Sequence, residues 1–207
     1  MTNCPACGAP LETPVACGAC GAVLAVSDSA TPFELFGLPP GFAVDERDLR
    51  RRSTRFSRLV HPDFFAASDP AVRERAERNS ARLNLAFDVL SDAARRADWL
   101  VVHLGGPTEE TERAMPQAFL MEVLEWNELL EEARTASGMD PRIEPLAAEL
   151  GARRQAALGR IASLLDPLPA RGSAQLAAAR RELNALRYLD RALGEIDTLR
   201  LARAERR

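Results

Sequence analysis

The chain has 207 residues, a length that accommodates one or two domains with a small appendage. Its net charge of −3 excludes the overall basic field that general nucleic-acid binding requires. No apolar run approaches the roughly 20 residues that cross a bilayer, and the first residues lack the basic and apolar parts of a secretion signal, so we expect a cytoplasmic protein.

All the cysteines fall at the start of the chain and form two C-x-x-C pairs: Cys4, Cys7, Cys17 and Cys20. Two such pairs supply four thiolates, enough to close a tetrahedral metal site. A glycine follows each pair and tolerates the left-handed backbone that turns amides toward the sulfurs. We therefore predict one structural zinc ion, which must supply the folding free energy of a segment too short for its own core.

Disulfides, a redox C-x-x-C motif and iron in a rubredoxin-like site are the alternatives to zinc. Disulfides fit poorly with a reducing cytoplasm, and the redox motif normally lies in a βαβ unit, of which the sequence has no sign. Iron is the main remaining alternative. The segment Val23 to Val26 is a candidate strand that closes this module, which we expect, with its linker, to cover residues 1–30.

Helical patterns fill residues 31–106. Thr31 and Pro32 indicate a helix start, and Asp45 is expected to cap the next helix. The expected helices cover residues 33–36, 45–61, 71–90 and 93–104. Because Pro62 cannot continue a helix, the second and third helices should form an antiparallel hairpin joined by a bend there. Gly105-Gly106-Pro107 ends the series and indicates a domain boundary after residue 106.

Three further amphipathic helices are expected in residues 107–207. They cover residues 116 to about 137, 140–165 and 173 onward. Asp140 should cap the second, with Pro141 at its first helical position, and Ser173 should cap the third. Short connections between amphipathic helices predict an antiparallel three-helix bundle, so the whole fold is expected to be all-α.

His61 and Asp63 flank Pro62 at the end of a helix rich in arginine, an arrangement that suits a docking loop or a catalytic dyad. An acid–base enzyme also needs a pocket and usually a nucleophile with oxyanion donors. The sequence has no Gly-rich phosphate loop, G-x-S-x-G elbow or H-E-x-x-H motif. His103 suits a cation at a helix C-terminus. We therefore favour the docking loop and do not expect an enzyme.

Several segments resemble the HscB family of J-proteins, the iron–sulfur cluster co-chaperones. They are residues 33–39 (FELFGLP), 59–65 (LVHPDFF), 96–100 (RADWL), 118–126 (AFLMEVLEW) and 186–190 (LRYLD), with Asn84, Ala86 and Phe87. The likeness covers residues 31–207. It implies a J-domain over residues 31–106 and a C-terminal bundle over residues 107–207. A four-cysteine module precedes these domains in part of the family.

The resemblance implies that the protein binds an ATP-bound heat shock protein 70 class chaperone, of the HscA or DnaK type, and stimulates its ATPase. His61, Pro62 and Asp63 would be the stimulating loop. An arginine face would meet an acidic surface of the chaperone: Arg51, Arg52, Arg55 and Arg58. Without the loop, a solvated helix face would be the preferred interpretation. Phe64 departs from the basic residue that the family commonly has there, which removes one cation beside the loop.

The resemblance also implies that the bundle binds an IscU-type scaffold protein. The matching residues are Leu120, Met121, Leu124, Glu125, Glu128, Glu132, Arg187 and Tyr188. Spacing independently gives the helix two apolar stripes, one through Phe119 and Trp126 and one through Leu120 and Leu124. The second stripe, rimmed by carboxylates, suits a partner surface, although a bundle that wraps both stripes is the alternative.

Two rival functions follow from the same features. One is a generic J-protein whose bundle takes another client. The other is a zinc ribbon that acts on nucleic acid, but small apolar residues surround the cysteines where such ribbons carry basic and aromatic ones. Ligation of an iron–sulfur cluster by the cysteines is a further alternative to zinc.

Overall fold

The computed structural model describes residues 3–115, 117–135 and 140–204. Its elements are α1 (Pro32–Leu35), α2 (Glu46–Leu59), the 3-10 helix η1 (Pro62–Phe65), α3 (Pro70–Ser91), α4 (Ala93–His103), α5 (Gln117–Thr135), α6 (Ile143–Leu165) and α7 (Ala174–Ala204). In these ranges β structure is limited to two isolated bridges, Asn3–Pro10 and Ala16–Val23, so the predicted all-α fold is confirmed. No helix described here has the length and apolarity to cross a membrane.

The chain divides into two compact units, Met1–Arg96 and Ala97–Arg207. The division falls within α4. The first unit contains the cysteines and the helices α1 to α3, and the second contains α5, α6 and α7. The domain boundaries that the sequence suggests after residues 30 and 106 stay predictions.

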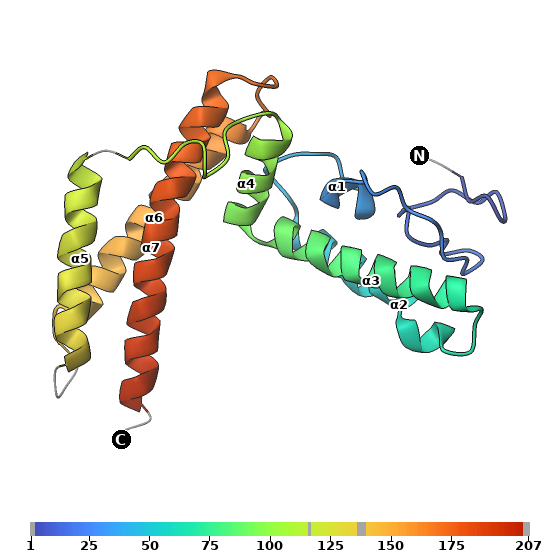
Figure 1. Ribbon diagram of the computed structural model, residues 1–207, viewed down its shortest axis with the longest axis horizontal. Helices are drawn as coiled ribbons and strands as arrows, with labels where there is room; N and C mark the ends of the chain where they lie inside the picture. The colour runs from blue at the N-terminus through green and yellow to red at the C-terminus, as the bar shows by residue number, and fades with distance from the viewer. Residues whose placement is uncertain (1–2, 116, 136–139, 205–207) are drawn as a thin grey trace. The chain divides into compact units, whose positions relative to one another are not determined.

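Helices α2 and α3 form the predicted hairpin, and η1 lies in the turn between them (Figure 1). Asp45 caps α2 as predicted, because its carboxylate accepts two backbone N–H groups of the first turn. Asp69 caps α3 in the same way, with Pro70 at the first helical position, so this helix begins one residue earlier than expected. Phe36 joins α1 to the hairpin through ring contacts with Phe56 and Phe87, at centroid distances of 6.1 and 6.4 Å.

Side chains of α3 hold the cysteine segment, residues 3–26, by its backbone. Asn79 is 2% exposed, and its Nδ2 donates to the carbonyl oxygens of Val15 and Leu24, both at 2.9 Å. Arg75 donates to the carbonyl of Val23. Arg82 donates to the carbonyls of residues 26 and 27. The cysteine segment is therefore anchored to the hairpin by bonds between residues more than fifty positions apart.

The predicted strand from Val23 to Val26 is wrong. Only Val23 forms a bridge, to Ala16, and the following residues have no strand conformation. The physical reason is the position of the hydrogen-bond donors. The carbonyl groups of this segment bond to the side chains of α3, where a strand would bond to a neighbouring strand.

Gly37 lies where the cysteine segment passes close to the end of α1. Its φ is +62°, and a Cβ there would clash with the carbonyl oxygen of Glu12. Both conditions require glycine. The Thr13 hydroxyl adds a hydrogen bond to the carbonyl of Leu35 at 2.8 Å.

Helices α5, α6 and α7 form the predicted three-helix bundle in the second unit, with α5 beside α7 (Figure 1). Trp126 and Leu130 of α5, Ile143 and Leu150 of α6 and Ile196 of α7 share one buried cluster. The stripe of α5 that includes Phe119 and Trp126 therefore faces the core. The expected ends of the first bundle helix, at Pro116 and at 136–138, lie outside the described residues.

Two predicted helix caps in the bundle are wrong. Helix α6 begins at Ile143, two residues after Pro141, because Asp140 accepts from the backbone and guanidinium of Arg142 and closes a turn ahead of the helix. Ser173 precedes α7 as expected, but its hydroxyl is buried without a hydrogen-bond partner among the described residues and does not cap the helix.

Arg180 ties α4 and the segment after it to α7. Its side chain is 2% exposed, with Nη1 2.5 Å from Oδ1 of Asp98 and Nε donating to the carbonyl of Pro107 at 2.9 Å. Asn184, one turn further along α7, donates to the carbonyl of Glu112 at 2.8 Å. These buried polar contacts fix the segment 107–112 along α7.

Candidate functional site

The thiols of Cys4, Cys7, Cys17 and Cys20 come together at one point. Their Sγ atoms all lie within 4.8 Å of one another. The Sγ atoms of Cys4 and Cys20 are 3.8 Å apart, and those of Cys7 and Cys17 are 3.7 Å apart. A tetrahedron with metal–sulfur bonds of about 2.3 Å has edges of about 3.8 Å, so the four thiols fit a metal ion. No disulfide joins them.

The backbone around the cysteines has the predicted knuckle form. Gly8 and Gly21 have φ of +75° and +73°, and each donates its N–H to the carbonyl of the first cysteine in its pair, at 2.8 and 2.9 Å. The amides of Cys20 and Ala19 lower the pKa of Cys17 to about 7. The Ala9 amide also favours the thiolate of Cys7, but the neighbouring sulfurs raise its pKa to about 12. Because four thiolates at this distance repel, full ionisation calls for a cation.

The loop of His61, Pro62 and Asp63 is presented to solvent. The side chains of His61 and Asp63 are 53% and 85% exposed, and Nδ1 of His61 accepts the backbone N–H of Asp63 at 3.3 Å. Phe64 is 71% exposed and packs edge-on against the His61 ring, with centroids 5.8 Å apart. This geometry suits docking, because a catalytic dyad would lie in a site that excludes water.

The four arginines proposed from the sequence differ in their surroundings. Arg51 is exposed and pairs with Asp48, and Arg58 is exposed and makes no ion pair within the described part of the chain. Arg52 is only 27% exposed and donates to the carbonyls of residues 36 and 37, so it supports the end of α1. Arg55 pairs with Glu12 of the cysteine segment. Helical spacing could not separate these roles, because Glu12 and residues 36 and 37 come from other elements.

The second apolar stripe of α5 is exposed. Leu120 is 41% exposed, and Met121 and Leu124 are each 55% exposed. Glu125, Glu128 and Glu132 lie exposed beside them, and Glu132 pairs with Arg142 at 2.7 Å. We call these six residues the α5 face. The bundle does not wrap both stripes, so three large apolar side chains remain in water beside a rim of carboxylates.

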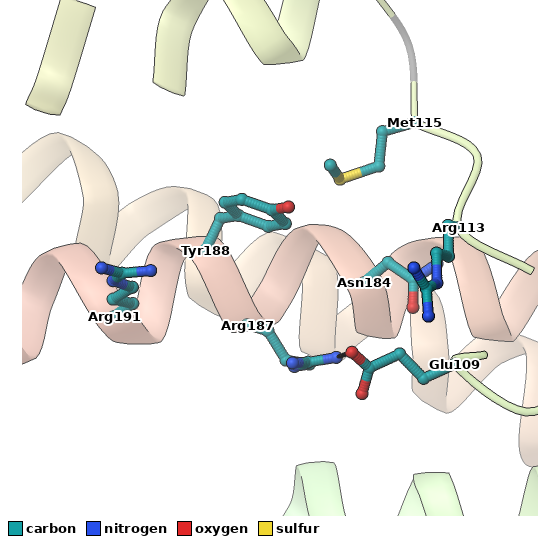
Figure 2. A pocket seen from close by; sticks show the side chains of 7 residues that line it. All are labelled: Glu109, Arg113, Met115, Asn184, Arg187, Tyr188 and Arg191. Carbon is teal, nitrogen blue, oxygen red and sulfur yellow. Dashed lines mark ion pairs between the residues drawn. The ribbon is translucent and has the colours of Figure 1, made fainter. Parts of the chain in front are cut away.

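Tyr188 and Arg187 lie on α7, outside the α5 face. Tyr188 is 39% exposed and packs edge-on against Phe119 of α5, with ring centroids 6.3 Å apart. Arg187 pairs with Glu109. Both line a pocket of about 500 Å³ shown in Figure 2, which we call the arginine pocket: Glu109, Arg113, Met115, Asn184, Arg187, Tyr188 and Arg191.

Sequence reasoning missed most of the arginine pocket. The segment 107–115 meets α7 about seventy positions further along the chain, as the hydrogen bond from Asn184 to Glu112 shows. Local spacing carries no signal for such a contact. A surplus of arginine in the middle of α7, at 187 and 191 on one side of the helix, was the available hint.

Known proteins resemble this chain in sequence and in fold. The family model of the HSCB C-terminal oligomerisation domain matches residues 115–197. A co-chaperone protein HscB homolog of Burkholderia mallei is 38% identical over 152 residues, which are 72% of this chain and 86% of that protein. The homolog of Burkholderia multivorans is 35% identical over 175 residues, which are 83% of this chain and 94% of that protein.

Two solved structures have the same fold. The crystal structure of human co-chaperone protein HscB matches with a TM-score of 0.77 and 25% identity, over 95% of this chain and 98% of that one. Chaperone HscB from Vibrio cholerae matches with a TM-score of 0.71 and 24% identity, over 83% of this chain and 98% of that one.

Proposed function

This chain belongs to the HscB family of co-chaperones, and from that membership we propose that it delivers an IscU-type iron–sulfur scaffold to a heat shock protein 70 class chaperone. Residues 31–106 would be the J-domain and residues 107–207 the scaffold-binding domain. The protein would act in the cytoplasm, as a regulator of its partner and not as an enzyme itself. The observation that carries the proposal is the exposed, acid-rimmed α5 face in a member of this family.

The exposed loop supports a role in stimulating the ATPase of an HscA- or DnaK-type chaperone. In our proposal His61, Pro62 and Asp63 contact the chaperone. The side chains of His61 and Asp63 are each more than half exposed, so a partner can reach them. Arg51 and Arg58 would supply most of the charge that attracts its acidic surface. Arg52 and Arg55 would contribute less, since their side chains are 27% and 52% exposed, against 73% for Arg51. Attraction of this kind raises the association rate and weakens with salt.

The α5 face, with Arg187 and Tyr188, would bind the scaffold. An apolar centre of Leu120, Met121 and Leu124 inside a rim of carboxylates matches the general anatomy of a protein interface. These leucines support no core, so their truncation should affect binding far more than folding. Truncation of a central interface residue can cost about 1–2 kcal/mol or more, and we expect a loss of that size for each leucine.

Two variants test the two halves of the proposal. We expect Asp63→Asn to abolish stimulation of the chaperone's ATPase while leaving scaffold affinity unchanged. We expect Leu120→Ala with Leu124→Ala to weaken scaffold binding by roughly 30-fold or more in calorimetry. Leu201→Ala is the control, because Leu201 is an exposed leucine on α7, outside the α5 face.

The controls decide between this function and a generic J-protein. Intact stimulation by Asp63→Asn would contradict the J-domain assignment. A purified chain that stimulates the chaperone but does not bind an IscU-type scaffold would favour a different client. Equal losses of scaffold affinity in Leu201→Ala and in the double variant would show that the α5 face is not the scaffold-binding surface.

We also propose that the four cysteines hold one zinc ion with a structural role. All four positions are protein thiols, so none stays open for substrate. Zinc bound there would hold the two knuckles together. Metal analysis of the purified chain should give one zinc per molecule and no visible iron absorption. Four free thiols without metal, or iron in place of zinc, would contradict the assignment.

A further inference from the structure

The arginine pocket carries more positive charge than its neighbours neutralise. Three guanidinium groups and one carboxylate line it, and Glu109 pairs with Arg187. Arg113 is exposed and has no ion pair within the described ranges. Arg191 is 79% exposed, and its guanidinium lies 3.4 Å from the carboxylate of Glu195. Arg134 lies nearer to the same carboxylate, at 3.0 Å, so Glu195 is shared between two arginines. The pocket therefore has a local surplus of positive charge.

A buried acceptor faces the same pocket. Asn184 is 5% exposed, and its Oδ1 has no hydrogen-bond partner among the described residues. The orientation of this amide is fixed, because its Nδ2 donates to the carbonyl of Glu112. An unpaired buried acceptor is unfavourable, so a ligand that brings a donor gains by binding there.

These two features select the ligand. Arg113 and Arg191 offer donors for an anionic group, and Asn184 offers an acceptor for a donor. A peptide with an acidic side chain supplies both, because its carboxylate can reach a guanidinium while a backbone N–H reaches Oδ1. Met115 and Tyr188, whose side chains point toward one another in Figure 2, give the pocket an apolar wall that suits a peptide.

A groove leads from the arginine pocket to helix α5. Tyr188 and Arg191 also line this groove between α5 and α7, together with Asn127 and other residues of α5. Leu120, Leu124 and Asn127 follow one another at helical spacings of four and three, so they lie on one side of α5. Packed helices lie about 8–10 Å apart, a distance that about three extended residues cross.

We propose that the arginine pocket binds an acidic side chain of the client scaffold, about three residues from an apolar residue held by Leu120 and Leu124. This inference rests on the proposed function, because it adds a second anchor to the same client. It assigns Arg113, Arg191 and Asn184 to the client interface, beyond the residues that the family resemblance supplies. The pocket would select clients with an acidic residue at that spacing.

Calorimetry of the full chain with a purified IscU-type scaffold tests the inference. We expect Arg113→Gln with Arg191→Gln to weaken binding roughly tenfold and to make the affinity less dependent on salt, because two charge-assisted bonds are lost. Both side chains are exposed, so the fold should be kept. Arg50→Gln with Arg78→Gln is the matched control: it removes two exposed arginines of the first unit, each in a single i,i+4 pair.

Each outcome bears on the inference in one direction. Tenfold weakening that the control does not share supports it. Unchanged affinity in the Arg113 and Arg191 variant overturns it. An equal loss of affinity in the control also overturns it, because the effect would then come from the change in net charge alone. Binding of inorganic phosphate to the pocket that leaves the scaffold affinity unchanged at constant ionic strength would assign the pocket to a free anion and overturn the peptide. Two results would contradict the proposed function as well as the inference: a wild-type chain that does not bind the scaffold, or normal binding by the Leu120 and Leu124 variant.

Discussion

Replacing Asn79 with alanine should release the cysteine segment from α3 without unfolding the hairpin. The Asn79 amide gives two hydrogen bonds of 2.9 Å to backbone carbonyls of this segment, at Val15 and Leu24. Each bond contributes about 1 kcal/mol net, and buried carbonyls left without a donor add to the loss. We therefore expect local opening of the segment to become easier by about 2–3 kcal/mol.

Hydrogen exchange followed by mass spectrometry measures this opening directly. A change of about 2–3 kcal/mol corresponds to exchange roughly 30- to 150-fold faster in residues 15–27, while the amides of α2 and α3 keep their rates. Arg75 and Arg82 still hold the segment in the variant, so the loss should stay local.

Asn84→Ala is the matched control, because Asn84 is an exposed asparagine on the same helix. Unchanged exchange in residues 15–27 of the Asn79 variant would refute the anchoring role. Equal acceleration across α3 would indicate that Asn79 stabilises the hairpin as a whole. The metal-loaded protein should be used throughout, so that loss of the ion does not contribute.

Two further predictions concern charged pairs of the second unit. Arg180→Met removes the side chain that holds Asp98 and Pro107, and the lost hydrogen bonds should lower the stability of this unit by about 2 kcal/mol and its Tm by about 8 °C in calorimetry. A Tm within about 2 °C of wild type would contradict the anchoring role of Arg180. The Arg142 guanidinium and backbone N–H lower the pKa of Asp140 to about 2, from its usual value of 3.8. The ionised Asp140 therefore contributes its full stabilisation at pH values above 3.8, and this stabilisation is lost as the pH falls through about 2. Arg142→Ala should return the pKa toward 3.8 in an NMR titration, and an unchanged pKa would show that the pairing is absent in solution.

Features encoded by local spacing were predictable from the sequence. The two C-x-x-C pairs come together because each knuckle is built from neighbouring residues, and the helices follow their apolar periodicity. Capping by Asp45 was predictable for the same reason, since the carboxylate bonds to amides two and three residues away. The exposure of the second stripe of α5 was not predictable, because periodicity does not say how far a bundle wraps one helix.

Features that depend on distant partners were not predictable. The segment from Val23 to Val26 has strand-like composition, but donors on α3 bind its carbonyls. Arg52 and Arg58 share one basic helix, yet Arg52 supports α1 while Arg58 remains exposed. The arginine pocket combines side chains about seventy positions apart. In each case the decisive contact joins elements whose relative position no local pattern encodes.

The position of Tyr188 gives the molecule an internal reporter. It is the one tyrosine in the sequence, and it lies between Phe119 of α5 and the arginine pocket. Fluorotyrosine introduced during expression would therefore give a single fluorine resonance from the proposed client interface, with no background from the rest of the chain. Its chemical shift would report occupancy of that surface during delivery, without any cysteine label that could disturb the thiols of the metal site.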